Sequence, residues 1–179
     1  MYDFIVRDGT IIDGTGNVGF RGHIAIEGDT LQVLRGDISS VPRETTVDAS
    51  HCVVAPGFID AHTHSDLVVL SEPLNEAKIR QGVTTEMIGL DGLGYAPLSK
   101  RNLEMMLMYW SGVNGYPELD YNWRSVSDYL QRYYHTTSGT VGDFVPQNCL
   151  RAEVVGWENR PATRDEIRAM QEMLRPGMA

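Results

Sequence analysis

From residue 55 onward, short apolar stretches alternate with amphipathic stretches. The apolar stretches predict strands at residues 58–62, 83–89 and 140–145. A helix is expected at residues 75–81, ended by Gly82 in the left-handed conformation. Strands that alternate with helices form a parallel sheet, either doubly wound or closed into a (β/α)8 barrel. A complete barrel needs ~250 residues, so about three strand-helix units would be only the first part of one, and the rest would have to follow Ala179.

Two further helices are expected between the second and third of these strands. Apolar residues recur there at helical spacing in two groups: Leu103, Met106, Leu107 and Trp110, then Val126, Tyr129, Leu130 and Tyr133. Residues 112–123 between the two groups are rich in Gly, Pro, Asn and Tyr, and we expect them to form an excursion. Near the end of the chain, Thr163 and Glu166 have the spacing of a capping box, which predicts the start of another helix.

Residues 2 to about 54 have the pattern of short strands joined by turns. Strands are expected near residues 3–6, 10–13, 22–27, 30–34 and 51–54. The pairs Asp8-Gly9 and Gly28-Asp29 are turn signals between them. We therefore expect a small β domain over residues 1–54, followed by the strand-helix units over residues 55–179.

Two histidines stand two residues apart in Ala55-Pro-Gly-Phe-Ile-Asp-Ala-His-Thr-His64. Side chains alternate across a strand, so Asp60, His62 and His64 would share one face if the strand continued through them. Two imidazoles on one face can bind one divalent metal ion. Barrel enzymes keep their active sites at the C-terminal ends of the strands, and the motif predicts a metal site there. The other interpretation is a polar strand end, since such a pair is common.

Charge and composition narrow the classes of partner. There are 15 basic and 24 acidic residues, a net charge of −9, and no cluster of Lys or Arg, which argues against nucleic acid as a partner. No segment has the length and apolar character of a signal peptide or a membrane span, so a cytoplasmic protein without membrane contact is expected. Cys52 and Cys149 are far apart in the sequence and are expected to be reduced, buried thiols. No feature of the sequence indicates an oligomeric state.

The order of these features resembles the amidohydrolase superfamily. A β module is followed by Pro56-Gly-Phe-Ile-Asp-Ala-His-Thr-His64, and Gly82-Val-Thr-Thr85 then opens the next strand. The resemblance implies an α/β fold, a metal-dependent (β/α)8 TIM barrel preceded by a small β-sandwich-like domain, of which this chain is the N-terminal part. It also implies that His62 and His64 bind a catalytic metal, usually one or two zinc ions.

Within that superfamily, the chain looks most like the D-aminoacylases, which are N-acyl-D-amino-acid deacylases. The similar segments are Gly139 to Arg151 and Gly156 to Thr163. One departure concerns the loop after the second strand, where the better-known members have Gly-Asn-Cys-Gly with a metal-binding cysteine. Here the stretch is Gly89-Leu-Asp-Gly92, which puts Asp91 in the place of the thiolate. A carboxylate can also bind zinc, although Asp-Gly is equally a turn pair.

The resemblance implies hydrolysis of the amide bond of small-molecule N-acyl-D-amino acids to a carboxylate and a free D-amino acid. Such an enzyme is a hydrolase of carbon-nitrogen bonds other than peptide bonds. The general-base carboxylate is expected beyond Ala179, so the 179-residue chain is expected to be inactive by itself. A cyclic amidase of the hydantoinase or dihydroorotase type is the first alternative, and a non-catalytic fragment or interaction module is the second.

The remaining polar residues have structural interpretations. Asp66 is expected to cap a helix or to support the metal ligands from behind. His23 and His51 are expected to be surface or packing residues of the β module. His135 is expected at the end of a helix, where a cation suits the helix dipole.

Overall fold

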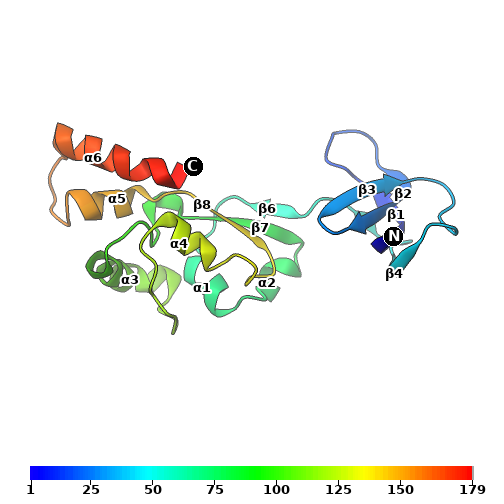
Figure 1. Cartoon of the computed structure of the whole chain (residues 1–179), viewed down its shortest axis with the longest axis horizontal. Helices are drawn as coiled ribbons and strands as arrows, with labels where there is room; N and C mark the ends of the chain where they lie inside the picture. The colour runs from blue at the N-terminus through cyan, green and yellow to red at the C-terminus, as the bar shows by residue number, and fades with distance from the viewer. Residues whose placement is uncertain (179) are drawn as a thin grey trace. The chain divides into compact units, whose positions relative to one another are not determined.

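The computed structural model describes residues 1–178 and divides into two compact units (Figure 1). The first unit is Met1–Pro56, and the second begins at Gly57. Each unit has its own sheet and its own apolar core.

The first unit is a five-stranded sheet in the order β3-β2-β1-β4, with β5 also paired to β1. Its strands are β1 (Tyr2–Ile11), β2 (Phe20–Glu27), β3 (Thr30–Leu34), β4 (Arg43–Asp48) and β5 (Val53–Val54). Strand β1 is antiparallel to β2 and parallel to β4 and β5. A small cluster of Ile5, Ala25 and Ile38 forms the buried core of this unit.

Two sequence predictions for the first unit are wrong. Residues 3–6 and 10–13 were expected to form separate strands around an Asp8-Gly9 turn. Instead, the single strand β1 continues through Asp8 and Gly9. The pairing with β2 shifts register between Val6 and Gly9, and Asp8 has a φ of 60°. A β-bulge tolerates the positive φ of an Asp-Gly pair as a turn does. The second error concerns Cys52, which was expected to be buried and is exposed.

The second unit contains a parallel sheet in the order β6-β7-β8, which confirms the predicted parallel arrangement. Its strands are β6 (Phe58–Asp60), β7 (Val83–Ile88) and β8 (Thr140–Asp143). Strand β6 ends earlier than expected, because the residues from 61 to 65 have no strand pairing. His62 and His64 therefore lie in the loop after β6, and strand alternation does not place them.

Helices follow each strand of the second unit. They are α1 (Asp66–Ser71), α2 (Glu76–Ile79), η1 (Leu90–Gly92), α3 (Lys100–Asn114), α4 (Val126–Gln131), α5 (Gln147–Val154), α6 (Arg164–Leu174) and η2 (Arg175–Met178). The helices predicted around Leu103 and Val126 and after Thr163 are confirmed, as is the positive φ of Gly82. Helices α1 and α5 were not predicted. None of the helices in the described part of the chain is long and apolar enough to cross a bilayer.

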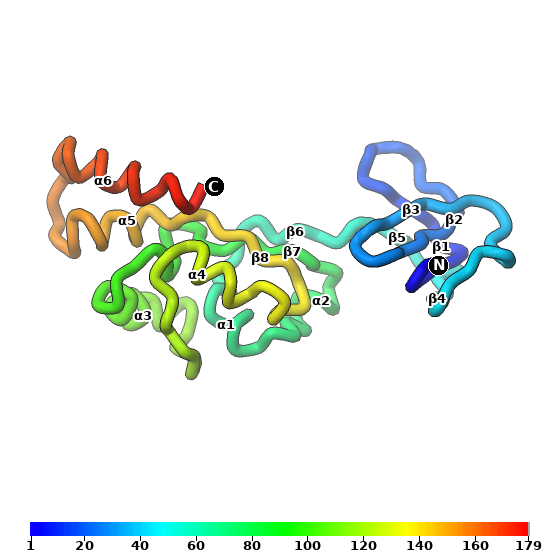
Figure 2. The backbone as a smooth tube through the Cα atoms, viewed as in Figure 1, coloured from blue at the N-terminus to red at the C-terminus, as the bar shows by residue number. Residues whose placement is uncertain are grey.

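An aromatic core holds α3 and α4 against the sheet. Leu103, Met106 and Leu107 are buried, as their spacing predicted. The excursion between the helices begins after Asn114, where α3 ends, and Figure 2 traces it to α4. It contributes Trp123, which is 1% exposed and whose Nε1 donates to the Tyr95 carbonyl oxygen at 3.0 Å. Part of the excursion is therefore core.

Candidate metal centre

The loop after β6 presents the two histidines of the sequence motif. The Asp60 carboxylate, at the end of β6, accepts a hydrogen bond from the His62 backbone N–H at 3.2 Å. This bond turns the chain at the strand end, as aspartate does in many turns. The His62 and His64 ring centroids are 5.6 Å apart with an angle of 81° between the planes. The rings thus stand edge to face rather than stacked.

The structure brings Asp91 to these two rings. Its Oδ2 lies 3.0 Å from His62 Nε2 and 3.4 Å from His64 Nε2. The three residues each offer a ligand atom, and these atoms all lie within 4.8 Å of one another. The sequence placed Asp91 here only by its resemblance to a cysteine of the family.

A left-handed turn after β7 carries Asp91 into this position. Gly89, Asp91 and Gly92 all have positive φ, at 76°, 56° and 76°. A Cβ on Gly89 would lie 2.2 Å from the Phe144 carbonyl oxygen and 2.4 Å from Asp143 Oδ1. Glycine is required at 89 because both its φ and its close contact with β8 exclude a side chain.

The donor set and its spacing fit zinc. Two imidazole nitrogens and one carboxylate oxygen are ordinary zinc ligands, and bonds of ~2.0–2.1 Å at a tetrahedral ion separate neighbouring ligand atoms by ~3.3 Å. The separations of 3.0 and 3.4 Å are close to this value. His64 Nδ1, on the other side of the ring from the atom near Asp91, is buried and has no hydrogen-bond partner among the described residues. In a histidine that binds zinc through Nε2, Nδ1 is the nitrogen that donates to a carboxylate, a carbonyl oxygen or water.

Access to the three side chains is uneven. The side chains of His62 and Asp91 are 61% and 57% exposed, whereas that of His64 is 29% exposed. The cluster is therefore open to a small molecule at His62 and Asp91 and partly shielded at His64.

Two buried carboxyl groups lie near the C-terminal ends of the strands: Asp66, in the segment after β6, and Asp143, the last residue of β8. Asp66 is the first residue of α1, and the N-cap of α1 is Ser65, so the first of the two roles expected for Asp66, the helix cap, is wrong. The second role, support of the metal ligands from behind, stays a prediction. Burial raises the pKa of Asp66 to about 7 and that of Asp143, at the end of β8, to about 8. None of their carboxylate oxygens has a hydrogen-bond partner in the described part of the chain. Asp143 was not among the residues singled out in the sequence, although its position at the end of a parallel strand was a usable signal.

The other residues singled out in the sequence lie outside this cluster. His23 Nδ1 accepts from the Asp8 backbone N–H at 3.0 Å, and its Nε2 is 3.0 Å from the Gly36 carbonyl oxygen, so His23 is a packing residue. His135 lies beyond the end of α4, with a φ of 57°. Cys149 is buried, as expected, and its Sγ donates to the Gly94 carbonyl oxygen at 3.2 Å. Burial raises the pKa of the Cys149 thiol, which makes it a poor nucleophile.

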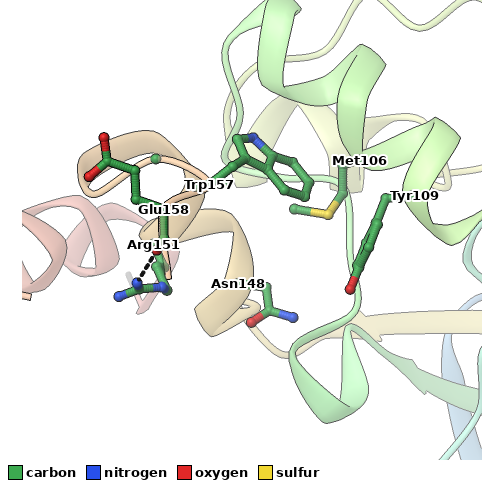
Figure 3. A pocket seen from close by; sticks show the side chains of 8 residues that line it. Met106, Tyr109, Asn148, Arg151, Trp157 and Glu158 are labelled. Atoms are coloured by element: carbon green, nitrogen blue, oxygen red, sulfur yellow. Dashed lines mark hydrogen bonds between the residues drawn. The ribbon is translucent and has the colours of Figure 1, made fainter. Parts of the chain in front are cut away.

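A separate pocket of 360 Å³ lies between α3, α5 and the loop after α5 (Figure 3). It is lined by Met106, Tyr109, Asn148, Arg151, Ala152, Gly156, Trp157 and Glu158. There, the Arg151 guanidinium donates hydrogen bonds to the carbonyl oxygens of Glu158 and Arg160, at 2.9 and 2.6 Å. Neither histidine of the cluster lines this pocket, and only Asn148, which is against Gly92, connects it to the Asp91 turn.

Comparison with known proteins places the chain in a family. No family model matches it. It is 35% identical over 181 residues to a D-aminoacylase from Alcaligenes xylosoxydans xylosoxydans, covering 99% of this chain and 36% of that protein. A crystal structure of a D-aminoacylase described as an amidohydrolase superposes with a TM-score of 0.76 at 33% identity, over 97% of this chain and 35% of the other.

A second solved structure is the N-acyl-D-glutamate deacylase from Bordetella bronchiseptica, in complex with zinc and a phosphonate inhibitor. It superposes with a TM-score of 0.77 at 28% identity, over 98% of this chain and 36% of the other. The chain thus spans about a third of the length of these relatives, and each of the three matches covers at least 97% of it. Its own structure is an α/β fragment with a small separate β unit. The chain belongs to the D-aminoacylase family of amidohydrolases.

Proposed function

We propose that this chain supplies part of the metal centre of a zinc-dependent amidohydrolase that releases D-amino acids from N-acyl-D-amino acids. The observation that carries the proposal is the convergence of His62, His64 and Asp91. Their ligand atoms lie within 4.8 Å of one another, after two neighbouring parallel strands. The 35% identity to a D-aminoacylase supports the substrate class.

In this proposal, the two histidine rings and the Asp91 carboxylate hold one zinc ion. Zinc bound there would serve as a Lewis acid toward the amide carbonyl and toward water. The protein orients the ligands through the Asp60 bond to the His62 amide and through the glycine turn around Asp91. The exposed side of the cluster, at His62 and Asp91, is where the acyl group would approach.

The same proposal extends to the fold. We assign β6, β7 and β8 as the first three strands of a (β/α)8 barrel, with residues 55–179 in the barrel and residues 1–54 in the small β domain. The parallel order of the three strands supports this assignment. The ligands follow the C-terminal ends of β6 and β7, which is the end where barrel enzymes bind substrates.

Zinc binding tests the metal centre. Zinc affinity is measured by competition with a chromophoric chelator for the wild-type chain and for His62→Ala, His64→Ala and Asp91→Ala. Loss of a direct ligand is expected to weaken binding by at least the ~10–100-fold that is lost when a residue in contact with a ligand is changed. His51→Ala is the matched control, because His51 is exposed and lies in the first unit. Equal zinc affinity in all five proteins would refute the proposed centre.

The substrate class needs a separate assay. A zinc-loaded protein that carries this sequence is offered N-acetyl-D-amino acids, their L-enantiomers and a hydantoin, and the products are quantified. Hydrolysis confined to the D-enantiomers is expected. Hydrolysis of the hydantoin alone would replace the deacylase by a cyclic amidase while leaving the metal centre in place.

A further inference from the structure

A group of three charged side chains contacts the histidine loop, residues 62–65. Lys78 of α2 forms ion pairs with Asp60 of β6 and, at 3.2 Å, with Glu86 of β7. The Glu86 side chain is 4% exposed, and the side chains of Lys78 and Asp60 are 26% and 27% exposed. The triad is therefore shielded from solvent far more than an ordinary surface ion pair.

The positions of the two carboxylates make a cation necessary. Asp60 and Glu86 are directly paired residues of the parallel strands β6 and β7. Like charges side by side on neighbouring strands repel each other, and a buried carboxylate without a partner is costly. The Lys78 ammonium lies between them and neutralises this repulsion. It also holds the pKa of the Asp60 carboxyl below its usual value, together with the His62 backbone amide.

Both carboxylates are also attached to the histidine loop. Asp60 Oδ1 accepts from the His62 backbone N–H at 3.2 Å. Glu86 Oε2 accepts from the Ser65 hydroxyl, directly after His64, at 3.0 Å. Lys78 Nζ itself lies 3.4 Å from the Thr63 hydroxyl, between the two histidines. The triad thus contacts the loop at the His62 amide, between the two histidines at Thr63, and after them at Ser65.

We propose that Lys78 is a positioning residue for the metal centre. By holding Asp60 and Glu86 together, it fixes the loop of residues 62–65 so that His62 and His64 present their Nε2 atoms to Asp91. This inference rests on the proposed function, because it assumes that the three residues bind zinc. It assigns to Lys78 a role that the sequence motif does not reveal, since Lys78 lies 14 residues after His64.

The alternative is an ion triad that only stabilises the fold. The two roles differ in what they change, because a structural triad affects unfolding and a positioning triad affects the affinity of the folded protein for zinc. Groups that hold the ligands of a metal ion in place typically contribute ~10–100-fold to metal affinity. Zinc affinity and unfolding must therefore be measured on the same variants.

The test compares Lys78→Met with Lys78→Arg and Lys100→Met. Lys100 is the only other lysine, and it forms an exposed pair with Glu104 on α3. At a temperature well below unfolding, Lys78→Met is expected to bind zinc about 10-fold more weakly or worse. Lys78→Arg is expected to recover affinity because it keeps the charge, and Lys100→Met to match the wild type. The visible absorption of bound cobalt(II) is expected to change in Lys78→Met, because it reports the arrangement of the ligands.

A double variant covers the case in which Lys78→Met does not fold. Lys78→Met with Glu86→Gln removes the ammonium together with one of its carboxylates, so no buried charge of Glu86 is left unpaired. Weak zinc binding by this folded double variant supports the positioning role. Wild-type affinity and cobalt absorption in the folded Lys78→Met protein or in the folded double variant would overturn it. If His62→Ala and His64→Ala bind zinc as the wild type does, the metal centre itself fails, which is a different result.

Discussion

The two units of the chain differ in whether their buried polar side chains have hydrogen-bond partners. In the first unit, the buried polar side chain of His23 has a partner for each ring nitrogen. In the second unit, buried polar atoms without partners are concentrated among the described residues: His64, Asp66, Tyr95, Trp110, Asn114, Tyr129 and Asp143. Folded proteins tolerate such groups mainly where function requires them. The two carboxyl groups of this set, Asp66 and Asp143, lie near the ends of β6 and β8. The contrast indicates that the second unit is less stable at these strand ends than full pairing of its carboxyl groups would make it.

The largest expected effect tests whether the aromatic core of the second unit offsets this cost. Trp123→Ala removes a side chain that is 1% exposed and its hydrogen bond to Tyr95. We expect the free energy of unfolding of the second unit to fall by ~3–5 kcal/mol, as for other buried Trp truncations. Denaturant unfolding measures this change. Trp157→Ala is the control, since Trp157 is 43% exposed, and an equal loss in both variants would contradict the prediction.

The second effect has the opposite sign. Burial raises the pKa of Asp143 from its ordinary 3.8 to about 8. Well below pH 3.8 the carboxyl is protonated in both the folded and the unfolded chain, so it costs nothing there. As the pH rises from 4 toward 8, the unfolded chain loses this proton first, and the wild type becomes less stable. Asp143→Asn cannot ionise, so we expect it to be more stable than the wild type at pH 8 by ~2–3 kcal/mol.

Unfolding of both proteins at about pH 2 and at pH 8 measures this difference. The gain should vanish at the lower pH, where Asp143 is protonated in both the folded and the unfolded chain. A loss of stability at pH 8 would show that the Asp143 carboxylate is satisfied in the folded protein, which would remove one of the groups on which the comparison of the two units depends.

The origin of this contrast was only partly visible in the sequence. The apolar run before His62 and the spacing around Leu103 predicted a parallel sheet and a covering helix, because both are local patterns. The burial of Asp143 depends on pairing between β7 and β8, in which Thr85 lies opposite Thr140. The triad of Lys78 likewise depends on a pairing of β6 with β7. Contacts between residues so distant in sequence have no local pattern.

Two further discrepancies concern single strands. Strand β4 is Arg43–Asp48, which is mostly polar and exposed and lacks the alternation that predicts a strand. Pairing with β1 determines its structure instead. At the candidate site, the strand was expected to reach His62, but the Asp60 carboxylate binds the His62 amide and ends the strand pairing there.

The third effect tests the first unit, where buried polar groups are satisfied. His23→Ala leaves the Asp8 backbone N–H and the Gly36 carbonyl oxygen without their partner. We expect the first unit to lose ~1–2 kcal/mol of unfolding free energy, because unpaired buried polar groups are costly. His51→Ala, at an exposed position of the same unit, should be neutral. If His23→Ala stabilised the unit, the proposed difference between the two units would disappear.

The smallest effect asks whether the unpaired carboxyl groups of the second unit are confined to its strand ends. Helix α6 belongs to the second unit but has a complete capping box, in which the Thr163 hydroxyl accepts from the Glu166 backbone N–H and the Glu166 carboxylate accepts from the Thr163 N–H. Arg160 also donates to both oxygens of Glu166, at 2.9 and 2.7 Å. Because these groups are satisfied, Thr163→Ala should cost ~1 kcal/mol, as at other N-caps.

The pH dependence of this cap distinguishes it from the strand ends. The Arg160 guanidinium and the Thr163 amide lower the pKa of Glu166 from 4.5 to about 2. A depressed folded-state pKa stabilises the fold above pH 4.5, and this contribution is lost as the pH falls toward 2. Glu166→Gln should therefore be less stable than the wild type at pH 7 and approach it near pH 2, whereas Asp143→Asn gains as the pH rises. If Glu166→Gln also gained stability with rising pH, buried or unsatisfied carboxylates would extend beyond the strand ends, and the metal centre would no longer be singled out by them.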